Sequence, residues 1–257
     1  MNIELNKIYH GDCLEVMKSI KDKSIDMILC DLPYGTTACK WDVEIPFEPL
    51  WKQYLRIIKD KSAIILTSIQ PFTSFLINSN IKYFKCEYIW QKTKATNYIK
   101  ANEMPMKYHE NILLFGKHKI NYYPIMIKGK PYIKEAKSES NIKCIFKDTR
   151  KIGSINVNDG YRFPSSIIRI SNDNHFSLHP TQKPVPLFEY LIKTYTKENE
   201  VVLDNCIGSG TTAIACINTN RQYIGIEKDD HYFEVCNERI RKHLLLRKYQ
   251  QKWKVYK

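Results

Sequence analysis

A carboxylate, a rigid turn and an aromatic ring stand together in Asp-Leu-Pro-Tyr, residues 31–34, directly after the apolar run 25–30. At the end of a strand, the acid could accept hydrogen bonds from a ligand, and an exposed Tyr34 ring could stack on a flat one. Asp-x-Pro-Tyr is also ordinary turn chemistry. Taken alone, the tetrapeptide favours a turn, and a catalytic role needs support from elsewhere in the chain.

A second stretch, residues 201–215, combines a strand-end acid with a glycine turn. The apolar residues up to Asp204 predict a strand, and the run from Thr211 predicts a helix. Gly208 and Gly210 would let the backbone approach a ligand closely, and the helix N-terminus would favour an anionic group there. No Lys follows the second glycine, so the turn is not a phosphate-binding P-loop, and it lacks the full G-x-G-x-x-G of dinucleotide sites.

Glu227 lies at the end of the next predicted strand, residues 222–228. An acid at this place can accept hydrogen bonds from ribose hydroxyls. A tight structural turn and a surface Glu are the alternative when each feature stands alone. The glycine turn, Asp204 and Glu227 together indicate a nucleoside-bearing cofactor across the carboxyl ends of adjacent strands.

Most of the chain alternates apolar, strand-like runs with amphipathic, helix-like ones. This alternation predicts an α/β fold whose mostly parallel sheet is covered by helices on both faces. Residues 118–177 interrupt the pattern with basic and aromatic residues of no sustained periodicity, which is typical of an insertion or small subdomain. The predicted strands are 25–30, 63–68, 84–90, 111–117, 200–206 and 222–228, and the predicted helices are 48–60, 71–80, 185–196, 211–219 and about 230–247.

Composition limits the partners and the compartment. The chain has 257 residues, 43% of them hydrophobic, which suffices for one large domain or for one domain with an insertion. The net charge of +13, with eight Lys or Arg and no acid after Glu238, indicates a polyanionic partner, usually nucleic acid. A Lys-rich, solvated surface is the alternative explanation.

Neither a membrane nor an oxidising compartment is indicated. The chain contains no apolar run of about 18 residues and no signal-peptide layout, so a cytoplasmic protein is expected. Its eight Cys form no Cys-x-x-Cys pair, so neither a metal site nor disulfides are expected.

Three segments together resemble the amino-methylating DNA methyltransferases. Residues 31–34 resemble the [D/N/S]-P-P-[Y/F] catalytic motif, residues 204–212 (DNCIGSGTT) resemble the S-adenosylmethionine loop, and residues 179–184 (HPTQKP) are nearly diagnostic of one subgroup. The catalytic motif precedes the cofactor loop, which is the permuted order of the β class. Leu32 departs from the family's commonest residue, Pro, at a position that mainly contributes its backbone carbonyl.

The resemblance implies a Rossmann-like, S-adenosylmethionine-dependent methyltransferase fold and a sequence-specific enzyme that acts on double-stranded DNA. The target base is flipped out, and its exocyclic amine, N6 of adenine, takes the methyl group. Asp31 and the Leu32 carbonyl are expected to accept the amine N–H groups, while Pro33 fixes the turn and Tyr34 stacks on the base. The residues expected to bind the cofactor are Asp12, Lys183, Asp204, Cys206, Gly208, Ser209, Gly210, Thr211 and Glu227.

The resemblance also bears on Lys183 and on residues 90–98. Lys183 could approach the cofactor's carboxylate, or it could belong to a helix-entry turn shaped by Pro180 and Pro184. Residues 90–98 match a mobile loop beside the target base. Residues 109–117 match a strand near the catalytic face.

The implied organisation has a catalytic and cofactor-binding domain, residues 1–117 and 178–257, and a target-recognition insertion, residues 118–177. Arg, Lys, Asn and Gln in that insertion are the usual readers of base edges. The expected partners are double-stranded DNA and a candidate cognate restriction endonuclease. The enzyme is expected to be bacterial or phage-encoded and to act as a monomer or homodimer.

Several alternatives stay open at this point. Methylation of cytosine N4 is the nearest, because both bases offer a conjugated exocyclic amine. Methylation of RNA or of a protein glutamine is more remote, since related motifs for those substrates begin with Asn. A nicotinamide-dependent oxidoreductase would place its glycine turn near the N-terminus and leaves Asp31 to Tyr34 unexplained. A non-catalytic nucleic-acid-binding module has no use for the glycine loop.

Overall fold

The computed structural model describes residues 2–35, 43–135, 153–172 and 182–254. The chain divides into two compact units. The larger unit comprises Met1–Tyr123 and Ser166–Lys257, and the smaller comprises Pro124–Ser165.

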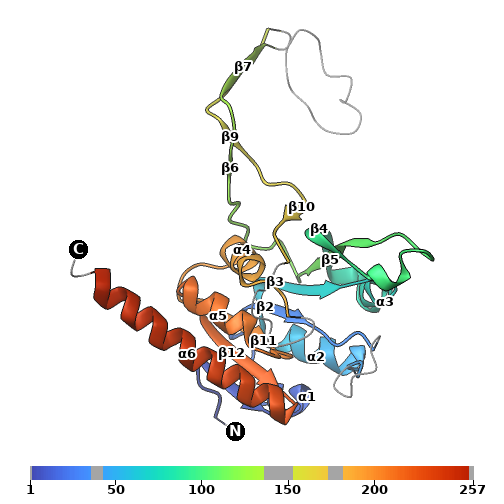
Figure 1. Ribbon diagram of the computed structural model, residues 1–257, viewed down its shortest axis with the longest axis vertical. Coiled ribbons are helices and arrows are strands. Elements are labelled where there is room, and N and C mark those ends of the chain that lie inside the picture. The colour runs from blue at the N-terminus through green and yellow to red at the C-terminus, as the bar shows by residue number, and fades with distance from the viewer. Residues whose placement is uncertain (1, 36–42, 136–152, 173–181, 255–257) are drawn as a thin grey trace. The chain divides into compact units, whose positions relative to one another are not determined.

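An eight-stranded sheet forms the centre of the larger unit, in the order β1-β12-β11-β2-β3-β5-β4-β10 (Figure 1). Neighbouring strands are parallel except at β5, which runs antiparallel to both β3 and β4. The predicted mostly parallel α/β sheet is therefore confirmed. In chain order the strands are β1 (Lys7–His10), β2 (Ile25–Asp31), β3 (Ile58–Ser68), β4 (Phe84–Thr96), β5 (Lys107–Phe115), β10 (Ile167–Arg169), β11 (Val201–Asp204) and β12 (Gln222–Glu227).

Apolar side chains of β2 point alternately to the two faces of this sheet. Met27 and Leu29 belong to one buried cluster, whereas Ile28 and Cys30 belong to the other, as the two-residue period of a strand requires. Helices complete both clusters, so β2 is covered on both faces. The first cluster is completed by α4 (Val185–Tyr195), α5 (Thr211–Asn218) and α6 (Asp230–Lys254), and the second by α1 (Cys13–Met17), α2 (Phe47–Ile57) and α3 (Phe72–Ser79).

One predicted helix boundary is wrong. The helix expected over 48–60 ends at Ile57, and β3 begins at Ile58 rather than at residue 63. Ile58 pairs with Ile25 at the start of β2, so tertiary pairing overrides the helical pattern of these residues. Lys59 then reaches Asp26 in a 2.6 Å ion pair.

Most of residues 90–98, expected as a mobile loop, are instead part of β4. This strand pairs with β5 as far as Thr96, with a register shift between Gln91 and Thr96. The short 3₁₀ helix η2 (Tyr98–Lys100) follows Asn97. Another, η1 (Ile81–Tyr83), precedes β4. Pairing of Trp90, Gln91 and Thr96 with β5 places this segment in a strand rather than in a loop.

Helix α6 is longer than predicted, since it extends to Lys254 rather than to about residue 247. Cys236 and Ile240 pack in the core, whereas Leu244 and Leu246 are exposed. No helix of the described residues, α6 included, combines the length and the apolar character needed to cross a membrane.

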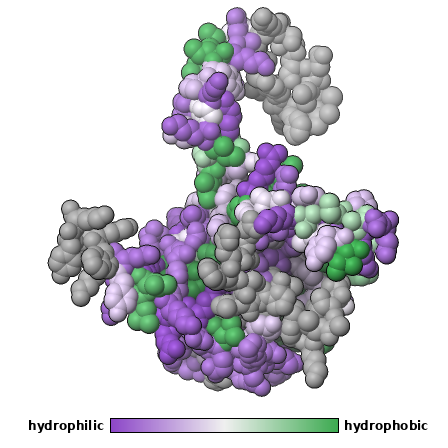
Figure 2. All heavy atoms as spheres, viewed as in Figure 1, coloured by the Kyte–Doolittle hydropathy of each residue, from purple (hydrophilic) through white to green (hydrophobic). Residues whose placement is uncertain are grey.

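The described residues of the smaller unit form two short antiparallel ribbons. One pairs β6 (Ile127–Lys128) with β9 (Tyr161–Arg162), and the other pairs β7 (Tyr132–Glu135) with β8 (Ile155–Asn158). Apolar residues lie on the ribbon surface (Figure 2), among them the cross-strand pair Ile133 and Val157, which are 74% and 69% exposed. This unit occupies the middle of the irregular region 118–177, whose target-recognition role stays a prediction.

Candidate active site

The residues that the sequence analysis singled out meet at one cavity of about 1130 Å³. Residues 206–209 and Glu227 line one part of it, and Asp31, Glu110 and Lys183 line another. The parallel strands β1, β12, β11 and β2 are neighbours, so their carboxyl ends bring Asp31, residues 206–209 and Glu227 to one edge of the sheet. Glu110 comes from the antiparallel strand β5, and Lys183 from the segment before α4. Gly210 is the only predicted site residue that does not line the described part of the cavity.

The glycine turn lies between the end of β11 and the start of α5. Gly208 and Gly210 have φ angles of +53° and +87°, in the left-handed region that favours glycine. A Cβ atom on Gly210 would lie 2.8 Å from the Cys236 sulfur of α6. Gly210 is therefore required by packing, whereas Gly208 faces the cavity.

Glu227 holds this turn against the end of β12. One carboxylate oxygen accepts the Gly208 amide at 2.7 Å, and the other accepts the amides of Lys228 and Asp229 at 2.9 Å. Burial raises the pKa of Glu227 above its ordinary value, although the three amides counteract the shift. The expected contact with ribose stays a prediction, but the carboxylate lines the cavity where it would be made.

Two further acids of the predicted cofactor site differ in burial. Asp204 is buried; it accepts the Cys206 amide at 3.1 Å and the Thr212 hydroxyl, and burial raises its pKa to about 7. Asp12 is partly exposed and caps helix α1, accepting the Leu14 amide at 2.9 Å. Its other oxygen lies 3.1 Å from the Lys228 ammonium.

Helix α6 supports the loop after Gly208. Arg239 donates to the Ser209 carbonyl at 2.9 Å and to the Ser209 and Thr211 hydroxyls at 3.2 Å. The Ser209 hydroxyl also lies 3.0 Å from Gln182 Oε1. This role of Arg239 could not be read from the sequence, because nothing in the pattern of a long basic helix separates a half-buried arginine from solvated ones.

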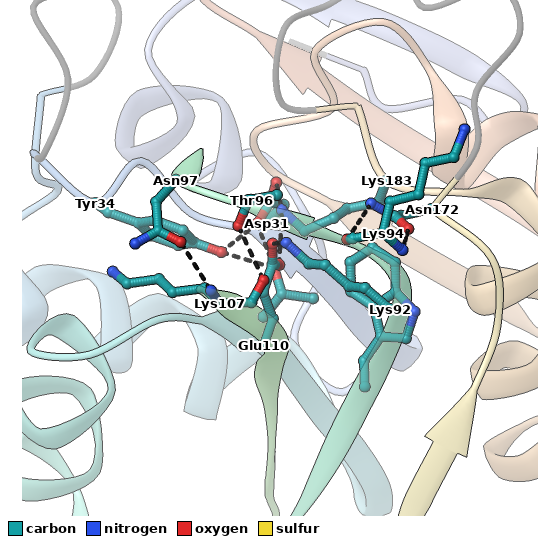
Figure 3. A network of polar contacts seen from close by, with 12 residues as sticks. Asp31, Tyr34, Lys92, Lys94, Thr96, Asn97, Lys107, Glu110, Asn172 and Lys183 are labelled. Carbon is teal, nitrogen blue, oxygen red and sulfur yellow. Dashed lines mark hydrogen bonds and ion pairs between the residues drawn. The ribbon is translucent and has the colours of Figure 1, made fainter. Parts of the chain in front are cut away.

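Asp31 stands at the centre of a polar network (Figure 3). Its Oδ1 atom accepts the Tyr34 hydroxyl at 2.6 Å and the Thr67 hydroxyl, and its Oδ2 atom accepts the Lys183 ammonium at 2.6 Å. Thr67 comes from β3, the parallel neighbour of β2, and pairs directly with Asp31. The carboxylate is thus oriented by three donors from three parts of the chain.

The charged end of Lys183 contacts Asp31, not the glycine loop. Its side chain is 6% exposed, and the ammonium also lies 3.4 Å from Glu110 Oε2. Burial alone would lower the pKa of Lys183, but the charges of Asp31 and Glu110 outweigh it and raise that pKa. Among the described residues, Lys183 reaches the loop through its backbone carbonyl, which accepts a 3.3 Å hydrogen bond from the Thr211 hydroxyl.

Glu110 and Lys92 complete a chain of four charges. Lys92 Nζ lies 2.5 Å from Glu110 Oε1, and both side chains are nearly buried. These residues come from β4 and β5, where Trp90 pairs with Glu110. Neither residue could be identified from the sequence, because the pairing of two strands that gathers the charges cannot be read from either strand alone.

The Tyr34 ring is half-buried, not the exposed ring that the sequence suggested. It packs against Phe72 with 5.1 Å between ring centroids, and the Lys183 ammonium lies 5.7 Å from its centre. The Leu32 side chain is buried, while Pro33 lines the cavity. His179, Pro180 and Thr181 of the His-Pro-Thr-Gln-Lys-Pro motif lie outside the described residues.

The site therefore combines two kinds of chemistry. Carboxylates near the glycine turn can accept hydrogen bonds from hydroxyl and amino groups, and an oriented carboxylate beside an aromatic ring can accept them from an amine. No group of three or more His, Cys, Asp or Glu among the described residues could hold a metal ion.

Comparison with known proteins matches this arrangement to one family. The family model for DNA methylases of the N6/N4 type matches residues 25–238. Type II methyltransferase M.HinfI of Haemophilus influenzae is 29% identical over 94% of this chain and 70% of its own length. Type II methyltransferase M.BglII of Bacillus subtilis is 27% identical over 90% of this chain and 68% of its own.

Solved structures share the fold. The complex of M1.HpyAVI with SAM (S-adenosylmethionine) superimposes with a TM-score of 0.61 at 23% identity, covering 91% of this chain and 98% of that one. The cytosine-N4-specific PvuII DNA methyltransferase gives a TM-score of 0.63 at 15% identity, covering 92% of this chain and 86% of its own.

Proposed function

The chain belongs to the DNA methylase family of N6/N4 methyltransferases, and we propose from this that it methylates the exocyclic N6 of a flipped-out adenine in double-stranded DNA. The methyl donor is S-adenosylmethionine. The observation that carries the proposal is the single cavity of about 1130 Å³, which is lined both by the glycine turn and by the oriented carboxylate of Asp31.

The residues around the glycine turn fit this cofactor. The acids Asp12, Asp204 and Glu227 line the cavity, and the ribose hydroxyls, adenine amine and α-ammonium group of S-adenosylmethionine are hydrogen-bond donors. Gly208 keeps the space beside its backbone free of a side chain. When bound, the cofactor supplies an electrophilic methyl group on a positively charged sulfur.

Asp31 and Leu32 supply what an exocyclic amine needs. The lone pair of the amine is delocalised into the ring, so the nitrogen becomes a better nucleophile when its N–H groups are held out of the ring plane. Asp31 accepts one N–H and the Leu32 carbonyl accepts the other, and both oxygens stabilise positive charge developing on nitrogen. Tyr34 lines the same part of the cavity, where stacking recovers part of the cost of flipping the base.

Adenine is preferred to cytosine because of residue 31. In the family that the motif resembles, Asp at this position accompanies adenine more often, and Ser accompanies cytosine. N4 of cytosine is the second candidate, since the cytosine-N4-specific PvuII enzyme has the same fold. Asp31 and the Leu32 carbonyl could accept hydrogen bonds from either the adenine or the cytosine amine.

DNA as the substrate agrees with the charge of +13. The smaller unit, residues 124–165, is proposed to read the target sequence. Because relatives are named Type II methyltransferases, we also propose that a cognate restriction endonuclease accompanies this enzyme.

Nucleoside mass spectrometry of DNA methylated in vitro tests the proposal. The DNA is first amplified so that it carries no modified bases, and the Asp31→Ala variant serves as the inactive control. N6-methyladenine is expected with the wild-type enzyme alone. N4-methylcytosine without N6-methyladenine would transfer the proposal to the second candidate, and the absence of both products would contradict DNA methylation.

A further inference from the structure

Glu110 contains an oxygen atom that has no hydrogen bond although it is buried. Oε2 receives none from the part of the chain that the structure describes, while Oε1 is held by Lys92 at 2.5 Å. The nearest cation is the Lys183 ammonium, 3.4 Å away, which is hydrogen-bonded to Asp31 Oδ2 at 2.6 Å instead. One buried ammonium therefore lies between two carboxylates and satisfies only one of them.

We propose that Glu110 is the second partner of Lys183, and that Lys183 moves from Asp31 to Glu110 when the substrate amine binds. The inference rests on the proposed function, because it needs a substrate amine that donates to Asp31. Glu110 and Lys183 are then positioning residues for methyl transfer, acting through the carboxylate of Asp31.

Counting acceptor positions identifies the oxygen atom of Asp31 that the amine would share with Lys183. A carboxylate oxygen accepts about two hydrogen bonds. Oδ1 already has two, from the Tyr34 and Thr67 hydroxyls. Oδ2 accepts only from Lys183 among the described residues. An incoming amine therefore donates to Oδ2, next to the ammonium.

Charge explains why a lysine that has moved away by the time of methyl transfer favours the reaction. Methyl transfer places positive charge on the amine nitrogen, and a neighbouring ammonium would destabilise that charge. A shift of Lys183 toward Glu110 separates the two cations and leaves Asp31 facing the amine. The cluster carries two negative and two positive charges, on Asp31, Glu110, Lys92 and Lys183. It is neutral overall, and it stays neutral when Lys183 shifts within it.

The geometry makes this movement short. An approach of about 0.6 Å brings Lys183 Nζ from 3.4 Å to an ordinary hydrogen-bond length of about 2.8 Å from Glu110 Oε2. A movement of about 1 Å takes it beyond hydrogen-bond reach of Asp31 Oδ2, from which it now lies 2.6 Å away. Lys92 fixes Glu110 from the other side, so the lysine and not the carboxylate moves. The movement also provides Oε2 with the hydrogen bond that it lacks.

A double-mutant cycle tests the proposal with single-turnover methyl transfer to unmethylated DNA at saturating S-adenosylmethionine. Glu110→Gln removes the charge that attracts Lys183, and we expect the rate to fall at least about tenfold. Cofactor affinity, measured by calorimetry, should change less than about twofold. In the Lys183→Met background, Glu110→Gln should change the rate less than about twofold, because Glu110 acts through Lys183.

Equal effects of Glu110→Gln in both backgrounds would overturn the inference, as would a matching loss of cofactor affinity. Asp26→Asn is the matched control: it removes a buried carboxylate with a 2.6 Å lysine partner, but it does not line the cavity, so it should lower the melting temperature without changing the rate. If the wild-type enzyme transfers no methyl group to DNA, the proposed function itself fails and this inference with it.

A second measurement needs no variant. In a crystal structure of the wild-type enzyme with S-adenosylhomocysteine and a duplex containing its target site, Lys183 Nζ should be hydrogen-bonded to Glu110 Oε2, and the amine to Asp31 Oδ2. A lysine that still donates to Asp31 Oδ2 while the base occupies the site would overturn the proposal.

Discussion

The Tyr34 hydroxyl donates a 2.6 Å hydrogen bond to Asp31 Oδ1, so the first and last residues of one tetrapeptide are joined through their side chains. The same hydroxyl lies 3.2 Å from the Thr67 hydroxyl, which also contacts Oδ1. The aromatic residue thus does more than offer a ring face, because its polar end helps to orient the acceptor of the substrate amine.

Tyr34→Phe should therefore lower the methyl-transfer rate about 2- to 10-fold, the equivalent of losing one hydrogen bond of about 0.5–1.5 kcal/mol. Tyr34→Ala should lower it much further, since the ring is removed as well. Tyr88→Phe is the control, because its hydroxyl pairs with Tyr195 outside the cavity. Single-turnover kinetics would contradict the orienting role if Tyr34→Phe matched the wild type.

Asp31→Ala should abolish methyl transfer, with a loss of at least about 100-fold, because it removes an acceptor that acts on charge developing in the transition state. Cofactor affinity should stay within about threefold, since Asp31 contacts Tyr34, Thr67 and Lys183 but not the glycine turn. Calorimetry with S-adenosylhomocysteine separates the two effects. Parallel loss of rate and affinity would place Asp31 in the cofactor site.

Gly208→Val should reduce cofactor affinity by at least about 1.4 kcal/mol, a factor of ten, because a side chain would fill the space beside the loop backbone. Backbone strain contributes to any loss of affinity, because valine would have to adopt the φ of +53° that Gly208 has. Gly153→Val supplies the matched control: its φ is +80°, no atom lies within 4 Å of the new Cβ position, and it lies in the smaller unit. Similar affinities for the Gly208 variant and the wild type would exclude this loop from the cofactor site.

Asp204 makes stability depend on pH. Burial raises its folded-state pKa from 3.8 to about 7, so the folded protein prefers the protonated form and loses stability as pH rises from about 4 to 7, with no further change above that range. Asp204→Asn removes this titration. Relative to the wild type, the variant should gain on the order of 4 kcal/mol between pH 4 and pH 8.

Urea unfolding of both proteins at the two pH values measures the difference for Asp204. The Asn side chain can still accept the Cys206 amide and pair with Thr212, so the comparison isolates the charge. A difference in unfolding free energy that is the same at both pH values would mean that Asp204 does not titrate in this range.

The basic C-terminal residues should contribute to DNA affinity without affecting the choice of site. Truncation after Tyr249 removes Lys252, Lys254 and Lys257 but keeps Arg247, which donates to the Ile217 carbonyl and, at 3.0 Å, to Asn220. The slope of log affinity against log salt should become shallower by about 0.9 for each phosphate that the shortened protein no longer neutralises. An altered methylated motif, read by sequencing of modified bases, would show that these residues read bases.

Local patterns in the sequence were sufficient for the fold class and for the strand-end acids that line the cavity. Apolar runs mark the strands at whose ends Asp31, Asp204 and Glu227 lie, and glycine permits the left-handed backbone that Gly208 and Gly210 adopt. Such features depend on neighbours within a few residues, so they can be read along the chain. The alternation of strand and helix then places strand-end residues at one edge of a parallel sheet.

Contacts between distant segments were decided only by the tertiary structure. Lys183 meets Asp31 across 152 positions, and Lys92 meets Glu110 because β4 and β5 are antiparallel neighbours. Strand order and register set these distances, and neither is encoded in the period of a single strand. The same limit explains why β3 begins at Ile58: its pairing with Ile25 outweighs a helical pattern that, taken locally, continued to residue 60.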